Sequence, residues 1–268
     1  MEPCDVVVLA TPAPHGPAVR SALALGAHVV STSDDLRDVR DVLDLGKDAE
    51  CSDRTVLVGA GFAPGLTCLL ARFAAADMDH VDEVHVARHG TGGPACARQH
   101  HRALSSTAVM WRDGRWMERS GGSGRELLWF PEPVGARDCY HAQLVDPTLL
   151  LPAFPEAQRL SARTSATRRD RLTARLPMLR PPHPEGGLGA VRIEVRGQRN
   201  GARVVEILGA VDRPAVAAGG VAALAALAAP TAPRGAYGLA DRRLDTIALL
   251  TELYRRGIRA ARFVGAGE

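Results

Sequence analysis

Lysine is almost absent from this sequence: of its 33 basic residues, only Lys47 is a lysine. A catalytic lysine is therefore excluded at every other position. Basic residues also outnumber acidic residues only slightly, so the formal net charge is +3. So small a charge does not indicate nucleic acid as the main partner.

Cysteine pairs and long hydrophobic runs are missing as well. The five cysteines are odd in number, widely spaced and without a C-x-x-C pair, which argues against a disulfide framework or a structural zinc site. The N-terminus shows no signal peptide. The longest apolar stretch, residues 215–229, is shorter than the roughly 18 residues of a membrane span and indicates a buried helix. We therefore expect a cytoplasmic protein without a membrane partner.

Several catalytic motifs are also absent, since the sequence has no serine nucleophile elbow, P-loop or paired-carboxylate motif. Four histidines lie near Cys96 in the sequence: His85, His89, His100 and His101. His100 and His101 are adjacent and point apart, so at most one of them can face a cleft. A metal site is therefore not expected, and His101 is a candidate proton donor.

The sequence does contain an alternation of strands and helices. Three apolar runs have the length of buried parallel strands. They are residues 6–9, 28–31 and 55–58. A helical pattern follows each of them, at residues 17–25, 34–45 and 65–76. Short loops between such elements require right-handed crossovers and a parallel sheet.

The glycine-rich turn that holds a pyrophosphate does not occur after the first of these strands. In doubly wound dinucleotide folds, a Gly-x-Gly-x-x-Gly turn follows the first strand of the first half. Here residues 6–9 are followed by a loop that contains Pro12 and Pro14. We therefore expect the second half of a Rossmann fold, with the first half lying upstream of Met1.

The pattern changes near residue 82. Asp113-Gly114 and Asn200-Gly201 are strong hairpin-turn signals, because these residue types accept positive φ. The alternating segments around them predict two antiparallel hairpins, at residues 107–119 and 191–208. Such hairpins indicate an α+β domain whose one-sided sheet leaves a face for solvent or ligand.

The segment between the hairpins, residues 154–183, is rich in arginine and proline. It indicates either a solvated helix with its basic face outward, which we prefer, or a patch for an anion or nucleic acid. The fold class predicted for the whole chain is α/β. A partial doubly wound parallel sheet spans residues 1–82, an inserted α+β domain with an antiparallel sheet spans 83–212, and C-terminal helices at 213–268 return to the first domain.

Ligands of open parallel sheets bind outside the carboxyl ends of the strands. Three loops lie there, and they carry Ala10, Thr11 and Pro12, then Ser31, Thr32, Ser33 and Asp34, then Gly61 and Phe62. The hydroxyls can hydrogen-bond a ribose or substrate, and glycines let the backbone approach a ligand closely. We expect Thr11, Ser33, Asp34 and Phe62 to form the rim of the main cleft, closed by the free face of the antiparallel sheet. Alternatively, Ser33 and Asp34 only cap the following helix.

The third loop allows a second interpretation. Residues 58–65 resemble a dinucleotide fingerprint between a strand and a helix, and Arg88 would then meet a 2′-phosphate. However, the spacing is Gly-x-Gly-x-x-x-Gly, Pro64 precedes the last glycine, and hairpins follow Arg88 instead of another βαβ unit. This interpretation is the weaker one.

Several segments resemble the saccharopine dehydrogenase-like NAD(P) oxidoreductases. They are HVVSTSDD at residues 28–35, VLVGAGFAPGL at 56–66, GGPACARQHHRAL at 92–104 and FPEPVGARDCY at 130–140. The resemblance extends from residue 5 to about residue 229. It implies a Rossmann domain whose first half holds the adenosine and pyrophosphate, and an inserted domain that covers the substrate. The nicotinamide side would be formed by residues 10–12 and 31–33, with Gly61 and Phe62 beside them.

The resemblance implies that NADP or NAD is used on a small imine, amino-acid or polyketide-type substrate, with Asp34 or His101 handling the proton. Two features depart from the family. The glycine-rich fingerprint is absent, and Ala63 stands where many relatives carry an acidic residue in a Gly-Phe-Asp-Pro-Gly motif. The alternatives are a cofactor-free, truncated relative that serves as a ligand-binding or scaffolding module, and a gene model that begins downstream of the true start.

The strand at residues 6–9 is expected to lie at an unpaired sheet edge, because its usual neighbour belongs to the absent half. Unpaired edges invite association. We therefore expect a homodimer or poor solubility. For the same reason, we expect the chain to bind NADPH weakly or not at all.

Overall fold

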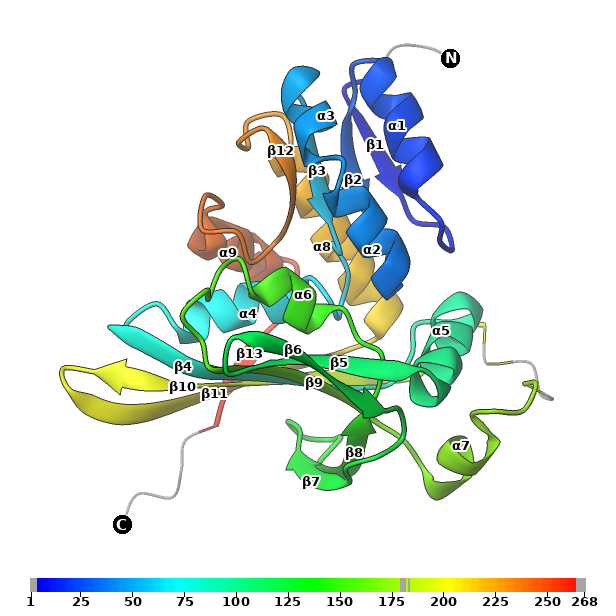
Figure 1. Cartoon of the computed structure of the whole chain (residues 1–268), viewed down its shortest axis with the longest axis vertical. Helices are drawn as coiled ribbons and strands as arrows, with labels where there is room; N and C mark the ends of the chain where they lie inside the picture. Colours follow the sequence, from blue (N-terminus) through cyan, green and yellow to red (C-terminus); the bar gives the residue numbers. More distant parts are fainter. Residues whose placement is uncertain (1–3, 179–181, 183, 264–268) are drawn as a thin grey trace.

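The computed structural model describes residues 4–178, 182 and 184–263. Its strands form two sheets, which lie one above the other in Figure 1 with helices between them. We call them the first sheet, which contains the N-terminal strands, and the second sheet. Within the described residues, no helix is both long and apolar enough to cross a membrane.

The first sheet is parallel and has the order β1-β2-β3-β12. Its strands are β1 (Val6–Leu9), β2 (His28–Ser31), β3 (Thr55–Val58) and β12 (Gly235–Gly238). The first three match the predicted strands at both ends. Every residue of β2 and β3 is buried, as a continuous apolar run in a parallel sheet predicts. The sequence does not predict β12, because Gly-Ala-Tyr-Gly has no β-branched residue and no alternation.

Helices α1 (Gly16–Ala24), α2 (Leu36–Leu43), α3 (Gly46–Cys51) and α8 (Pro214–Ala228) surround the first sheet (Figure 1). The helix that the sequence predicts over residues 34–45 is present as α2, and α3, which the sequence does not predict, follows it. The Asp35 carboxylate caps α2 by accepting hydrogen bonds from the backbone N–H groups of Arg37 and Asp38. The cap is therefore Asp35, and neither Ser33 nor Asp34 has that role.

The second sheet has the order β13-β11-β10-β4-β9-β5-β6, and β8 pairs with both β7 and β9. Its strands are β4 (His80–His89), β5 (Thr107–Arg112), β6 (Arg115–Ser120), β7 (Glu126–Trp129), β8 (Ala136–His141), β9 (Arg159–Ser165), β10 (Gly189–Arg199), β11 (Ala202–Asp212) and β13 (Ala260–Arg262). Both predicted hairpins are present, as β5-β6 and β10-β11. The residues of both turns, Asp113-Gly114 and Asn200-Gly201, have positive φ, as these tight turns require.

The arginine-rich segment contains a strand where a solvated helix was the preferred expectation. β9 lies between β4 and β5 and runs parallel to β4, so the second sheet is mixed and not purely antiparallel. Leu160 and Ala162 are buried in the core, and the arginines at 159 and 163 alternate with them on the opposite face. Because the segment is so rich in arginine, this alternation of apolar and polar residues is not recognised in the sequence. Only the short α7 (Arg168–Thr173) is helical, and Arg180 and His183 lie outside the described residues.

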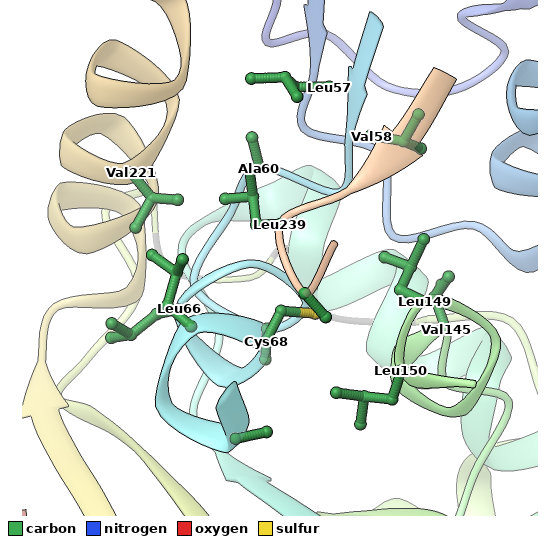
Figure 2. Packing of buried hydrophobic residues seen from close by; sticks show 14 of the residues in the cluster. Leu57, Val58, Ala60, Leu66, Cys68, Val145, Leu149, Leu150, Val221 and Leu239 are labelled. Atoms are coloured by element: carbon green, nitrogen blue, oxygen red, sulfur yellow. The ribbon is translucent and has the colours of Figure 1, made fainter. Parts of the chain in front are cut away.

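One hydrophobic core joins the two sheets. Helices α4 (Leu66–Ala74), α6 (Asp146–Leu150) and α9 (Thr246–Arg255) lie in this core region, and α5 (Pro94–Ser105) follows β4. Figure 2 shows side chains of one buried cluster that come from several elements: Leu57 of β3, Leu66 of α4, Leu150 of α6 and Val221 of α8. Apolar contacts between helices and both sheets therefore fix how the sheets sit relative to each other.

The face of the second sheet toward the first sheet is apolar. In β10, Val191, Ile193 and Val195 belong to the same core as α4, while Arg192, Glu194 and the arginine at 196 alternate with them on the opposite face. The free face therefore points away from the first sheet. The expectation that this face closes over the rim is wrong.

Candidate functional site

A cavity of about 400 Å³ lies between the carboxyl ends of β1 to β3 and the residues that follow β4. We call it the inter-sheet cavity. The three loops of the first sheet contribute Ala10, Thr11, Pro12, Thr32, Ser33, Asp34, Gly61 and Phe62. The opposite wall includes Arg88 at the end of β4, Cys96 and Gln99 of α5, and Ala215 and Ala218 of α8. The loops converge as the topology predicts, but α5 and α8 close the cavity, not the free face of the sheet.

The inter-sheet cavity contains an ion pair. Nη1 of Arg88 lies 3.3 Å from Oδ2 of Asp34, and the two side chains are 7% and 26% exposed. The same Nη1 donates to the Ala63 carbonyl at 3.0 Å. Burial opposes the charged form of Arg88 and is the largest single effect, but Asp34, Cys96 and Asp146 together outweigh it and raise the pKa of the guanidinium. Nε of Arg88 is buried and has no hydrogen-bond partner among the described residues, and Arg88 is one of the residues that line the cavity.

Helix α5 supports the pair from the other side. Nε2 of Gln99 donates to the Asp34 carbonyl at 3.4 Å, and Oε1 of Gln99 accepts from Arg102 at 2.7 Å. Cys96 also lines the cavity. Burial raises the pKa of its thiol, so Cys96 is a neutral wall group and not a thiolate nucleophile.

Asp146 is a second carboxyl group whose charge interacts with Arg88. It begins α6, is 1% exposed, and its Oδ1 accepts from the Thr67 hydroxyl at 2.6 Å. Burial raises the pKa of Asp146, while Thr67 and Arg88 act in the opposite direction. Oδ2 has no partner in the described structure. The sequence does not single out Asp146, because Asp-Pro is an ordinary helix start.

Ser31 does not line the inter-sheet cavity. Its side chain is fully buried, and its hydroxyl lies 2.8 Å from Nδ1 of His15. His15 in turn donates through Nε2 to the Thr11 carbonyl at 2.9 Å. The expected ligand contact of Ser31 is therefore replaced by a structural one, in which Ser31 and His15 hold the loop after β1. The sequence gives no sign of this role for His15.

His101 also lies elsewhere. It lines a different cavity with His89 and His100, and its Nε2 donates to the Leu176 carbonyl at 2.8 Å. On α5, the face toward the inter-sheet cavity is occupied by Gln99. The expectation that His101 shares a site with Asp34 is therefore wrong. No group of three or more histidine, cysteine or acidic side chains in the described part of the chain is arranged to hold a metal.

The helix N-termini at the rim of the inter-sheet cavity are partly occupied by protein acceptors. A pyrophosphate needs free N–H groups at a helix N-terminus, and at each of these three N-termini at least one N–H group already has an acceptor. At α1, the His15 N–H donates to Oδ1 of Asp38 at 2.7 Å. At α2, the acceptor is Asp35. At α4, the Leu66 N–H donates to the Gly61 carbonyl at 2.9 Å.

The third loop does not form the dinucleotide fingerprint considered from the sequence. The Gly61 N–H donates to the Pro64 carbonyl at 3.0 Å, so the loop closes on itself. Gly65 has φ +119°, and a Cβ there would lie 2.3 Å from the Gly61 carbonyl oxygen. This tight turn fills the space that a phosphate would need. Arg88, expected to meet a 2′-phosphate, is instead bonded to Asp34 and Ala63.

No protein-family model and no curated protein matches this sequence. Among solved structures, it is similar to apo saccharopine dehydrogenase (L-Glu forming) from Saccharomyces cerevisiae, with a TM-score of 0.68, 16% identity, and coverage of 97% of this chain and 85% of that chain. DAP dehydrogenase from C. glutamicum matches with a TM-score of 0.45, 14% identity and coverage of 95% and 82%. Amine dehydrogenase from Mycobacterium smegmatis matches with a TM-score of 0.47, 11% identity, and coverage of 89% of this chain and 75% of that chain. The chain therefore has the fold of saccharopine dehydrogenase, as the resemblance in its sequence predicts.

Proposed function

We propose that the inter-sheet cavity binds a small amino-acid-type or imine substrate, and that the protein acts on it as an NAD(P)-dependent oxidoreductase. The observation that carries the proposal is the Asp34–Arg88 pair, which lies where the three strand-end loops converge. The shared fold with saccharopine dehydrogenase supports the same reaction class.

The charges of an amino acid complement this pair. A substrate carboxylate can accept a hydrogen bond from the guanidinium of Arg88, and an ammonium or protonated imine can lie against Asp34. Phe62, Ala215 and Ala218 give the cavity an apolar wall for the rest of the substrate. These features favour an amino acid or imine over a polyketide-type substrate, which lacks both charges.

Reduction of an imine adds a hydride to carbon and a proton to nitrogen. When bound along Ala10, Thr11 and Pro12, NADP or NAD would supply the hydride. A protonated imine already carries that proton on its nitrogen, and the Asp34 carboxylate would accept a hydrogen bond from it while Oδ2 stays paired with Arg88. Arg88 fixes the position of that oxygen, and the buried setting of the pair limits the access of water.

A second candidate is a binding module that takes up the same substrate without a dinucleotide. The observation that favours it is the set of protein acceptors at the three helix N-termini, which leaves fewer donors for a pyrophosphate. Both candidates place the small ligand between Asp34 and Arg88. They differ in whether hydride transfer takes place.

The experiment combines binding and turnover on the full chain. Calorimetric titration with the standard amino acids measures binding, and oxidation or reduction of the nicotinamide in the same mixtures measures turnover. Arg88→Met is the test variant, and Arg98→Met, an exposed arginine of α5 outside the cavity, is the matched control. We expect Arg88→Met to weaken binding by about tenfold or more, the loss of one charge-assisted hydrogen bond, and Arg98→Met to have little effect.

Turnover that is lost in Arg88→Met and kept in Arg98→Met supports the oxidoreductase. Binding without turnover supports the module. Binding that is equally strong in both variants contradicts either function at this cavity.

A further inference from the structure

The free face of the second sheet carries a second cavity. It measures about 300 Å³ and shares no lining residue with the inter-sheet cavity among the described residues. Seven strands contribute side chains to it. In Figure 1, β7 and β8, which form one of its walls, lie on the side of the second sheet that faces away from the first sheet.

Six arginines line this cavity against two glutamates, counted over the described residues: Arg112, Arg119, Arg159, Arg163, Arg192 and Arg196, with Glu126 and Glu194. We call it the arginine pocket. The chain as a whole has a net charge of only +3. The lining nevertheless carries more positive than negative side chains, and a concave site with low-dielectric walls focuses the field of its charges.

Acidic side chains in and around the pocket hold five of these arginines in place. Asp113 pairs with Arg112, and Glu83 pairs with Arg159 and Arg196. Glu194 accepts from Arg192 and from Arg196, both at 2.6 Å, and Glu126 lies 2.8 Å from Arg163. The side chains of Arg192 and Glu194 are only 12% and 11% exposed. These guanidinium groups are therefore fixed before any ligand arrives, which lowers the entropy cost of binding.

Arg119 differs from these residues. Its Nη1 donates to the Glu118 carbonyl at 2.9 Å, and no carboxylate forms an ion pair with it in the described part of the chain. Arg119 thus brings an uncompensated charge to the pocket.

His141 is an independent sign of a missing partner. It lines the arginine pocket and is only 8% exposed. Its Nδ1 is buried and has no hydrogen-bond partner among the described residues. Burial, with the charges of Arg163 and Arg119, lowers the pKa of His141 to about 4. Buried polar atoms in native proteins are almost always paired, so a hydrogen-bond partner is missing beside this ring.

We propose that the arginine pocket is a binding site for a small oxyanion with two or more negative charges, carried by phosphoryl or closely spaced carboxylate groups. Guanidinium groups bind both chemistries through paired hydrogen bonds. Such a ligand supplies the counter-charge for Arg119 and an acceptor for His141. The site does not depend on the function proposed for the inter-sheet cavity.

The test is calorimetric titration of the full chain with inorganic pyrophosphate and, separately, with citrate, with acetate as the monovalent reference. Arg119→Met is the test variant. Arg203→Met is the control, because Arg203 is an exposed arginine of the same sheet that does not line the pocket. We expect saturable binding of pyrophosphate or citrate, weakened about tenfold by Arg119→Met and less than about twofold by Arg203→Met. Tighter binding of pyrophosphate would indicate a phosphoryl ligand, and tighter binding of citrate a polycarboxylate ligand.

A second readout follows the imidazole of His141 by NMR during a pH titration. A bound anion favours the imidazolium, so the bound probe should raise the pKa of His141. Equal weakening in both arginine variants, or a His141 pKa that the probe does not move, contradicts the proposal. So does a chain that binds neither probe, including one whose copies associate through this face.

Discussion

The pair formed by Asp34 and Arg88 is the part of the inter-sheet cavity where one substitution has a clear consequence. Asp34→Asn leaves Arg88 charged and 7% exposed without its counter-ion. We expect the free energy of unfolding to fall by about 2 kcal/mol, measured by urea denaturation. Asp41→Asn, at an exposed position of α2, should change it by less than about 0.5 kcal/mol. The double variant Asp34→Asn, Arg88→Met should recover part of the loss; no recovery would contradict the pairing.

Gly59 is a position where backbone conformation and packing act together. Its φ is +71°, and a Cβ there would lie 2.6 Å from Cδ1 of Leu149 and 2.9 Å from Cγ of Pro64. Gly59→Ala should therefore cost about 3 kcal/mol of stability, the combined effect of φ strain and overpacking. The control is Gly114→Ala, with φ +80° and nothing within 4 Å, which should cost only about 1 kcal/mol. Equal losses in the two variants would show that Leu149 does not press on Gly59.

His100 gives the stability a pH dependence. Burial, with Arg88 as the next contribution, lowers its pKa from 6.5 to about 4. The unfolded chain therefore takes up this proton first as the pH falls. Stability should be full above about pH 6.5 and should decline toward pH 4, by on the order of 2 kcal/mol for this group. Unfolding curves of His100→Gln, measured over this range, should show a shallower decline; an unchanged slope would assign the effect to other groups.

At the scale of elements, the sequence predicts best the segments whose local pattern determines their structure. β1, β2 and β3 follow from apolar runs flanked by loops, and both hairpins follow from Asp-Gly and Asn-Gly turns. β9 is not predicted, because arginine content conceals its period of two. β12 is not predicted either, since only its pairing with β3 makes Gly-Ala-Tyr-Gly a strand.

β1 is the element from which association is expected. It pairs with β2, and no other described strand lies beside it; Val8 is 44% exposed. Such an edge can pair with another chain, so sedimentation should show a concentration-dependent homodimer. Val8→Lys places a charge on the edge and should shift the equilibrium toward monomer, whereas Val216→Lys, on α8 and 60% exposed, should not. A chain that stays monomeric at high concentration contradicts this prediction.

At the scale of the whole molecule, topology explains which part of the site is predictable. Parallel strands bring their carboxyl ends to one edge, which is why residues from three separated loops meet at the inter-sheet cavity. Arg88 lines the cavity because β4 ends beside it. The Ser31 side chain does not line the cavity, because its hydroxyl is hydrogen-bonded to His15. Neither contact is visible in one sequence. The predicted position of His101 is wrong for a related reason: the direction of its side chain depends on how α5 packs, and one sequence does not show that packing.

The same arrangement predicts weak dinucleotide binding. At the starts of α1, α2 and α4, N–H groups already have protein acceptors at one or more positions, and a lost pyrophosphate contact set of about 3 kcal/mol lowers affinity more than about a hundredfold. Calorimetry with NADPH should show no binding at micromolar concentration. A micromolar dissociation constant for this chain would contradict the prediction.

Hydrogen–deuterium exchange tests the central claim, that the inter-sheet cavity binds an amino-acid-type ligand. The full chain is compared with and without each standard amino acid. With a bound ligand, slowed exchange should appear together in residues 10–14, 32–35 and 61–65, which surround the pair of Asp34 and Arg88. The Arg88→Met variant should lose this protection. Protection confined to the free face of the second sheet, or no protection with any of the amino acids, would contradict the account.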